Sequence, residues 1–332
     1  MARTVRRFAM LQPGERVLIG LSGGPDSSAL THALALLSDR LSLRLEALYV
    51  DHGIRGAAVD ADVAAASGLA STLGVGFRVR RVEVPAWARR RRLSLETAAR
   101  ELRYRALEEA AEELGAQKVA LGHTADDQAE TVLMWVLRGA GVAGLGGIPP
   151  VRGRFVRPLI EVWREEVQEY CQQAGLAPVE DESNRWELPL RNRVRHELLP
   201  LIESRIRPGA RRALVRLASL ARDDEAYLRS QAQEAWRRLA ATKQGGRLAV
   251  PARPLGALPA PLARRIVVRA FEEVSGGRRG ALGLQAVEAV LELARRGHGG
   301  RVVHLPHGVR AGVSGGWLWM AAGGGQARDG DG

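Results

Sequence analysis

The chain has 332 residues, of which 46% are hydrophobic and 26% are charged, so it is long enough for about two globular domains and is neither disordered nor collagen-like. Cys171 is the only cysteine, which excludes an intramolecular disulfide, a four-cysteine zinc site and a cysteine-bound iron-sulfur cluster held by one chain. With 49 basic and 37 acidic residues the net charge is +12, which favours a polyanionic partner over the alternative of a merely basic solvated surface.

No apolar run approaches the roughly 18 residues that would span a bilayer, and residues 1–16 lack the hydrophobic stretch of a signal peptide. The single thiol also suits a reducing compartment. We therefore expect a cytoplasmic protein with no membrane partner.

Residues 16–160 alternate between short β-branched runs and longer helical stretches, which is the pattern of βαβ units in a parallel sheet. The predicted strands are 17–21, 43–50, 77–84, 118–121 and 155–158. The predicted helices between them are 26–38, 59–73, 95–114 and 125–138. The Gly-rich segment 139–150 predicts a loop beside the strand ends.

The second half of the chain has a different character. Helices are predicted at 164–174 and 192–206, on either side of a polar stretch at 180–184. Further helices at 213–240 and 258–274 flank a Pro- and Gly-rich interval, and they are followed by a helix at 283–296 and short runs at 301–305 and 316–320. We expect domains over 1–212 and 213–322 and a disordered tail over 323–332.

A candidate anion site follows the first predicted strand. The segment Ser22, Gly23, Gly24, Pro25, Asp26 and Ser27 lies between that strand and a helix, so its backbone N–H groups are at the positive helix end where a phosphate would bind. It lacks the lysine of a Walker A loop and the spacing of a dinucleotide fingerprint. The alternative is a Gly-rich turn with an acid placed favourably at a helix N-terminus.

Two further segments follow predicted strands. Asp51 and His52 come after the second strand, and ligands of open parallel sheets bind over the carboxyl ends of the strands, so these residues can meet a nucleotide held by the first loop. His52 by itself is more often a hydrogen-bonded loop histidine than a catalyst. After the fourth strand, Asp126, Asp127 and Glu130 bring three carboxylates into the first turns of a helix. Such acids repel one another unless a cation lies among them, and the alternative is capping of the helix by Thr124.

The first of these segments resembles the SGGxDS loop of the PP-loop ATP pyrophosphatases. Further segments resemble one family within that group, the tRNA(Ile)-lysidine synthetases: VDHGIR, ETAARELRY, GHTADDQAET, RGAGVAGLGGIPP, RPLIEVWREEVQEYC, EDESN and RNRVRHELLP. The resemblance runs in order over residues 17 to 205. The end, HLPHGVRAGVSGGWLW, is similar to the family's small domain, except that His307 stands where we expect a glycine.

The resemblance implies an α/β fold, with a parallel, doubly wound, Rossmann-like PP-loop catalytic domain and a smaller C-terminal α/β domain that binds substrate tRNA. It implies a C–N ligase that uses ATP and Mg²⁺ to join free L-lysine to the wobble cytidine of tRNA(Ile) with a CAU anticodon. The cytidine is first adenylated with release of pyrophosphate, and lysine then displaces AMP. Lysine must react as the neutral amine, which is only about one molecule in 2,500 at pH 7, so a base or a desolvating pocket is required.

The resemblance also assigns expected roles to residues of this chain. ATP-binding residues are Ser22, Gly23, Gly24, Pro25, Asp26, Ser27, Asp51 and His52. Catalytic residues are Asp26, Asp127 and Arg100, lysine-binding residues are Asp126, Asp127 and Glu130, and Mg²⁺ ligands are Asp26 and Asp126. tRNA-binding residues are Arg103, Arg138, Arg191, Asn192, Arg195 and His196. The alternative is helix-surface charge for the first two and salt bridges between domains for the other four. Runs at Arg89–Arg92 and along the helix from Arg211 to Arg222 are further candidates for RNA phosphates.

Three other functions stay open at this point. A PP-loop tRNA thiolase also adenylates a base, although such enzymes generally use several cysteines and this chain has only Cys171. A non-catalytic RNA-binding module would not need so many carboxylates, and a small-molecule amide synthetase would not need the charge of +12. The sequence does not decide between a monomer and a homodimer, nor which acid serves as the base.

Overall fold

The computed structural model describes residues 1–54, 58–179, 190–244, 246–277, 282–297 and 299–322. It divides into two compact units, Met1–Ala221 and Arg222–Gly332. The division falls inside helix α11 (Ala210–Leu239), a few residues after the expected position. The polar stretch 180–184 and the tail 323–332 lie outside the described residues.

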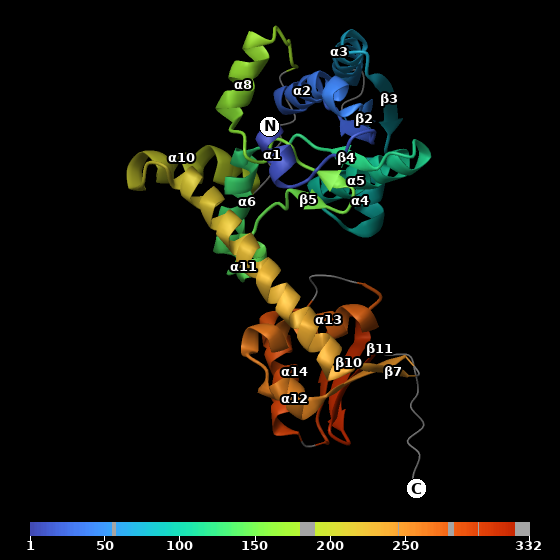
Figure 1. Cartoon of the computed structure of the whole chain (residues 1–332), viewed down its shortest axis with the longest axis vertical. Helices are drawn as coiled ribbons and strands as arrows, with labels where there is room; N and C mark the ends of the chain where they lie inside the picture. The colour runs from blue at the N-terminus through green and yellow to red at the C-terminus, as the bar shows by residue number, and fades with distance from the viewer. Residues whose placement is uncertain (55–57, 180–189, 245, 278–281, 298, 323–332) are drawn as a thin grey trace. The chain divides into compact units, whose positions relative to one another are not determined.

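The first unit is built on a six-stranded sheet with the order β3-β2-β1-β4-β6-β5 (Figure 1). Its strands are β1 (Arg16–Gly20), β2 (Arg44–Asp51), β3 (Gly76–Arg81), β4 (Lys118–Ala120), β5 (Val151–Arg152) and β6 (Phe155–Val156). Neighbouring strands are parallel, except that β5 and β6 form an antiparallel hairpin. The expected parallel α/β fold is confirmed, and β5 is an element that the sequence did not predict.

Both faces of this sheet are covered, because successive residues of a strand point to opposite sides. On one face, Val17 and Ile19 of β1 pack in the core that also contains buried residues of α1 (Ala2–Arg7), α2 (Pro25–Leu41), α3 (Ala58–Thr72) and α8 (Arg164–Gln173). On the other face, Leu18 packs with Leu107 and other residues of α5 (Leu95–Glu113). This alternation makes the sheet doubly wound.

The remaining helices of the first unit lie around one end of the sheet. They are α4 (Val84–Arg91), α6 (Ala125–Leu137), α7 (Val142–Leu145), α9 (Arg191–Arg193), η2 (Val194–Leu198), α10 (Leu199–Leu201) and η3 (Ile202–Ile206). The predicted helix at 192–206 is therefore continuous in outline, but η2 and η3 are π-helical turns within it. Helix α4 begins where a strand was predicted to end, since Pro85 in its first turn favours helix initiation.

The second unit contains a five-stranded antiparallel sheet with the order β7-β8-β11-β10-β9. Its strands are β7 (Thr242–Gln244), β8 (Arg247–Pro251), β9 (Val302–His304), β10 (Val309–Ser314) and β11 (Trp317–Ala322). Its helices after α11 are α12 (Ala252–Ala257), α13 (Ala260–Val274) and α14 (Leu284–Arg296), with a short 3₁₀ turn η4 (Pro306–Gly308). Strands β7, β8 and β10 and helix α12 were not predicted.

His307 occupies the position where the family resemblance leads us to expect glycine. Its φ angle is +59°, in the left-handed region that glycine adopts without a steric penalty. The imidazole lies 6.4 Å from the ring centroid of Phe271, a buried core residue. A side chain at this turn is therefore strained, and ring packing compensates for part of that strain.

Helix α11 is the longest helix of the described residues, and it is amphipathic, with buried alanine and leucine residues on one side and exposed charged residues on the other. Within the described part of the chain, no helix is both long enough and apolar enough to cross a membrane.

Candidate active site

A cleft of about 510 Å³ opens at the carboxyl ends of β1, β2 and β4. Its walls come from the loops that follow these strands, from α5 and from the start of the helical segment at 191. Ligand sites of open parallel sheets lie at this end of the strands. The predicted site residues that line the cleft are Ser22, Asp26, Ser27, Asp51, His52, Arg100, Arg103, Asp127, Arg191, Asn192 and Arg195.

The loop after β1 is held by its own serines. Ser27 Oγ accepts a hydrogen bond from Ser22 N at 3.1 Å and donates to Gly24 O at 3.0 Å. Ser28 Oγ donates to Gly23 O at 3.2 Å, and Gly23 has a φ angle of +84°. Because α2 begins at Pro25, the loop ends at a helix N-terminus, as a phosphate cradle requires.

Gly122, at the end of β4, lies directly against this loop. A Cβ atom at that position would be 3.1 Å from the carbonyl oxygen of Asp26 and 3.2 Å from the nitrogen of Ser27. Because the facing atoms belong to the backbone, a side chain here would require the two segments to move apart by a few tenths of an ångström, and glycine needs no such shift. The close contact brings the loop after β4 and the start of α2 to the same part of the cleft.

Asp51 and His52 form the wall of the cleft at the end of β2. Asp51 Oδ1 accepts a hydrogen bond from Gly53 N at 2.9 Å, which fixes the turn after the strand. The carboxylate also lies 3.9 Å from Arg81 Nε. Both predicted residues are therefore beside the loop that follows β1, on the neighbouring strand.

Asp26 is the carboxylate in the cleft with unused hydrogen-bonding capacity. Its Oδ1 atom is buried without a hydrogen-bond partner among the described residues, while Oδ2 lies 3.9 Å from Arg164 Nε. The pKa of Asp26 is raised from 3.8 to about 6, mainly by burial and in part by the neighbouring carboxylate of Asp127, against the opposing effect of Arg164. This group is a poorly stabilised anion that would gain from a nearby cation.

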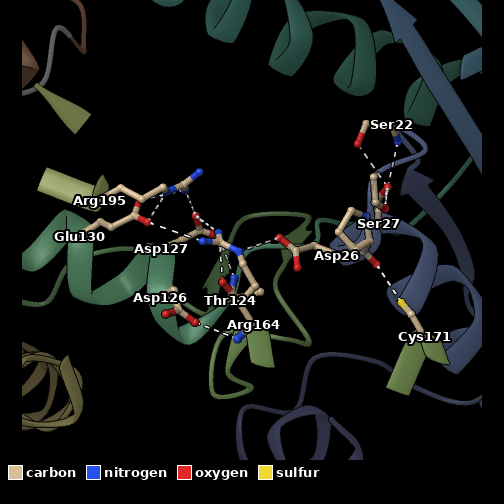
Figure 2. Close-up of polar contacts among 12 residues, drawn as sticks. Ser22, Asp26, Ser27, Thr124, Asp126, Asp127, Glu130, Arg164, Cys171 and Arg195 are labelled. Carbon is tan, nitrogen blue, oxygen red and sulfur yellow. Dashed lines mark hydrogen bonds and ion pairs between the residues drawn. The ribbon is translucent and has the colours of Figure 1, made fainter. Parts of the chain in front are cut away.

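Asp127 and Glu130 are held by guanidinium groups from distant segments (Figure 2). Arg191 and Arg195 each contact Asp127 Oδ1 at 3.1 Å, and they contact Glu130 at 2.9 Å and 2.6 Å, respectively. Arg164 Nη2 lies 3.5 Å from Asp127 Oδ1. The cation that the sequence argument required among these acids is thus supplied by the protein itself.

Asp127 has a second role in its own helix. Its Oδ2 atom accepts a hydrogen bond from Thr124 N at 2.9 Å, which caps the start of α6 as the capping alternative anticipated. Burial alone would raise the pKa of Asp127, but His123, the guanidinium groups of Arg191 and Arg164 and the hydrogen bond from Thr124 N together outweigh burial, and the pKa lies below its usual value. Asp127 is therefore ionised at neutral pH.

Asp126 does not line the cleft, and both of its oxygens have partners. Oδ2 accepts from Arg164 N at 2.8 Å and Oδ1 accepts from Arg211 Nη1 at 2.8 Å. Figure 2 shows its carboxylate apart from those of Asp127 and Glu130. These contacts make Asp126 the link between α6, the start of α8 and the start of α11. Glu130 is also absent from the cleft lining, and it is only 2% exposed.

A group of arginines surrounds Tyr104 of α5. The guanidinium carbons of Arg100, Arg103 and Arg152 lie 5.2, 5.8 and 5.5 Å from the centroid of its ring. Arg157, 2% exposed, donates from Nη2 to the Tyr104 hydroxyl at 3.2 Å and from Nη1 to Pro149 O at 2.7 Å. Burial lowers the pKa of Arg103, and its buried Nε has no hydrogen-bond partner among the described residues. Several N–H groups at this wall are thus available to a ligand.

His123 lines the cleft between these arginines and Asp127. The pKa of His123 is lowered to about 3, mainly by burial and in part by the nearby Arg103 and Arg157, against the opposing effect of Asp127. The imidazole is therefore neutral at physiological pH. Its Nδ1 atom is buried and lacks a partner within the described structure, so it can accept or donate one hydrogen bond to a bound molecule.

Two of the predicted tRNA-binding residues lie outside the cleft lining. Arg138 is exposed at the end of α6, with its guanidinium 5.4 Å from the centroid of Trp135, and His196 is exposed on η2. Sequence reasoning assigned no role to Arg157, Arg164 or His123. All three lie in segments that resemble the family, and this resemblance was the only feature of the sequence that could have identified them as site residues.

Comparisons with known proteins agree with this geometry. Residues 1–202 match the family described as the PP-loop domain. The chain is 41% identical to the tRNA(Ile)-lysidine synthase of Symbiobacterium thermophilum, over 93% of this chain and 66% of that protein. It is 40% identical to the tRNA(Ile)-lysidine synthase of Geobacter sulfurreducens, over 92% of this chain and 65% of that protein. The chain thus spans about two thirds of the length of these relatives.

Among solved structures, the U34-tRNA thiolase NcsA from Methanococcus maripaludis, with its 4Fe-4S cluster, superposes with a TM-score of 0.56 at 21% identity. The superposition covers 66% of this chain and 78% of the thiolase, and it shows a shared fold. The strand order, the loop between β1 and α2 and the sequence match all agree. The chain therefore belongs to the PP-loop family and is similar in sequence to its tRNA(Ile)-lysidine synthases.

Proposed function

We propose that this chain is a tRNA(Ile)-lysidine synthetase, a C–N ligase that joins L-lysine to position 2 of the wobble cytidine in a CAU anticodon. In the proposed reaction the ring carbonyl oxygen of cytidine attacks the α-phosphorus of ATP and releases pyrophosphate. The ε-amine of lysine then displaces AMP. The observation that supports this most directly is the cleft itself, which combines a phosphate cradle, ionised carboxylates and arginines at one end of the sheet.

ATP is proposed to bind with its phosphates at the loop of residues 22–27 and its nucleoside toward Asp51 and His52. The left-handed Gly23 and the helix N-terminus at Pro25 suit a phosphate, because backbone N–H groups and the helix dipole both attract an anion. The nucleoside end then lies along the neighbouring strand β2, at the same carboxyl edge of the sheet.

Mg²⁺ fits at Asp26, whose buried Oδ1 has no partner in the described structure and whose raised pKa shows that a cation would stabilise it. The described residues include no cluster of three or more acids, histidines or cysteines that could hold a metal alone. Mg²⁺ is commonly held by one or two carboxylates together with substrate phosphates, and when bound it neutralises charge on them. Asp126, the other expected ligand, already binds Arg164 N and Arg211.

The lysine ammonium is proposed to bind beside Asp127, where Arg191 and Arg195 now contact the carboxylate. A substrate ammonium would take the place of one guanidinium and find an ionised oxygen ready to orient it and accept its proton. Glu130, almost fully buried, would keep the remaining arginine in position rather than touch lysine. This narrows the expected lysine site from three carboxylates to one.

The tRNA is proposed to present its wobble cytidine to the wall formed by Arg100 and Arg103. Arg100 is exposed at the cleft, and Arg103 has a buried N–H without a partner among the described residues. A planar guanidinium can donate two parallel hydrogen bonds to a base edge or a phosphate. Arg138, exposed outside the cleft, would meet a more distant part of the tRNA.

Incorporation of labelled lysine into a tRNA(Ile) transcript with a CAU anticodon tests this function, in the presence of ATP and Mg²⁺. The matched control is the same transcript with uridine at the wobble position. Incorporation that requires both ATP and cytidine is the expected result. Pyrophosphate release without lysine incorporation would refute the proposed second substrate while leaving the ATP chemistry in place.

A further inference from the structure

Helix α4 starts at the edge of the cleft. Val82 N donates to Asp51 O at 2.7 Å and Val84 N donates to His52 O at 3.3 Å, so the chain enters α4 directly beside two residues of the cleft wall. The position of α4 is therefore fixed by the same strand ends that form the candidate active site.

An apolar cluster joins α4 to α5. Val84 and Ala88 of α4 are buried with Ala98 of α5, and Ile54 and Ala99 pack against them. Ile54 and Ala99 also line the cleft. One layer of side chains thus separates the interior of the cleft from α4.

The C-terminal end of α4 is strongly basic. Arg89, Arg90, Arg91 and Arg92 are all exposed, and residues 84–95 contain no acid. No carboxylate in the described part of the chain lies within 4.0 Å of any of these four guanidinium groups, although several nearby arginines have one. Those paired neighbours are Arg78 with Glu46, Arg80 with Glu113, Arg81 with Glu83 and Arg105 with Glu109.

One of these arginines, Arg92, has an unfavourable backbone conformation at the end of the helix. Arg92 ends α4 with a φ angle of +54°, a left-handed position where glycine is the usual residue. Arg91 stacks on Trp87, with 5.5 Å between its guanidinium and the ring centroid. A helix C-terminus favours a cation or two in its final turn, but four adjacent arginines repel one another unless an anion lies opposite.

We infer that the exposed C-terminal end of α4, formed by Arg89, Arg90, Arg91 and the capping residue Arg92, is a docking surface for the phosphate backbone of the RNA whose nucleotide enters the cleft. This inference rests on the proposed function, and it names the part of the protein that holds the strand beside the reacting nucleotide. Guanidinium groups bind phosphate oxygens with paired hydrogen bonds, and the four arginines need no displacement of an internal carboxylate to do so.

The test measures binding of the CAU-anticodon tRNA(Ile) transcript over a range of salt concentrations. In the first variant Arg89, Arg90, Arg91 and Arg92 are all replaced by serine, and in the second they are all replaced by lysine. A control variant removes the same charge by replacing four other exposed arginines by serine: Arg3, Arg6, Arg40 and Arg44. Each lost phosphate contact reduces the slope of log K against log salt by about 0.7 to 0.9.

The serine variant is expected to lower that slope by about 3, the lysine variant to keep most of it, and the control to change it by less than about 1. Lysine incorporation by the serine variant should show a raised KM for tRNA with little change in kcat. A serine variant with the wild-type slope, or a control with an equal loss, overturns the docking surface even if lysine incorporation continues. A wild-type protein that fails to bind tRNA overturns the proposed function as well.

Discussion

Replacement of Asp26 by asparagine should stabilise the protein while removing its activity. The carboxylate is buried in the cleft, and its pKa rises from 3.8 to about 6, mainly because burial disfavours the charged form. A shift of about 2 units corresponds to about 3 kcal/mol of destabilisation when the group is ionised. The favourable position of an acid in the first turn of α2 offsets about 0.5 kcal/mol, which leaves a net gain of about 2 kcal/mol for Asp26→Asn.

The sign of the pH dependence follows from the raised pKa. The folded protein holds the Asp26 proton more tightly than the unfolded chain does, so the wild type loses stability as the pH rises from 3.8 to about 6 and then stays level. Asp26→Asn has no such loss. The two proteins should therefore be nearly equal in stability at pH 4 and differ most above pH 6.

Urea unfolding followed by hydrogen exchange in peptides from β1 and α2 measures this difference in the first unit alone. The matched control is Asp126→Asn, which should lose stability at neutral pH because Asp126 has two close partners in Arg164 N and Arg211. An Asp26→Asn protein less stable than the wild type at pH 8 would refute the argument. Added Mg²⁺ and ATP should stabilise the wild type more than the variant, and an equal effect on both would remove Asp26 from the metal site.

Three further outcomes are expected. Glu130→Gln should lower the free energy of unfolding by about 3 kcal/mol in urea titrations, because Arg191 and Arg195 would lose a buried carboxylate; an unchanged midpoint would contradict this. Asp127→Asn should abolish lysine incorporation while circular dichroism stays unchanged, and a wild-type rate would exclude a catalytic role. Cys171→Ala should retain full incorporation, since the buried thiol only donates to Pro25 O at 3.7 Å, and loss of activity with an intact fold would revive sulfur chemistry.

The parallel sheet could be predicted from the sequence because its information is local. Strands β1, β2 and β4 are short, largely apolar runs, each followed by a helix, so a parallel sheet and a site at the carboxyl ends of its strands followed from general rules for βαβ units. The sheet of the second unit could not be predicted in the same way. Its strands β7 and β8 have only three and five residues, and β8 lies in a Pro- and Gly-rich interval, so neither gave a strand signal long enough to recognise.

The candidate site shows the same limit at the level of single side chains. The glycine loop and the acids of α6 were visible because each is one continuous segment. The partners of those acids were not, since Arg191 and Arg211 are 61 and 85 residues away from Glu130 and Asp126. The sequence also does not show which side chains are buried. It therefore did not reveal that the ionised Asp127 is already paired with arginines, or that Asp26 Oδ1 has no hydrogen-bond partner in the described structure.

Gly122 has a consequence for how this site can diverge or be redesigned. Its missing side chain lets two loops approach through main-chain contact, so exchange of one loop alone should disturb their separation. If segment 22–27 were replaced by the corresponding loop of another protein, position 122 should also take the residue that faces the loop in that protein. Substitutions in the two loops should then occur together. A library that randomises both loops should yield functional variants in which the residues of the two loops are correlated rather than independent.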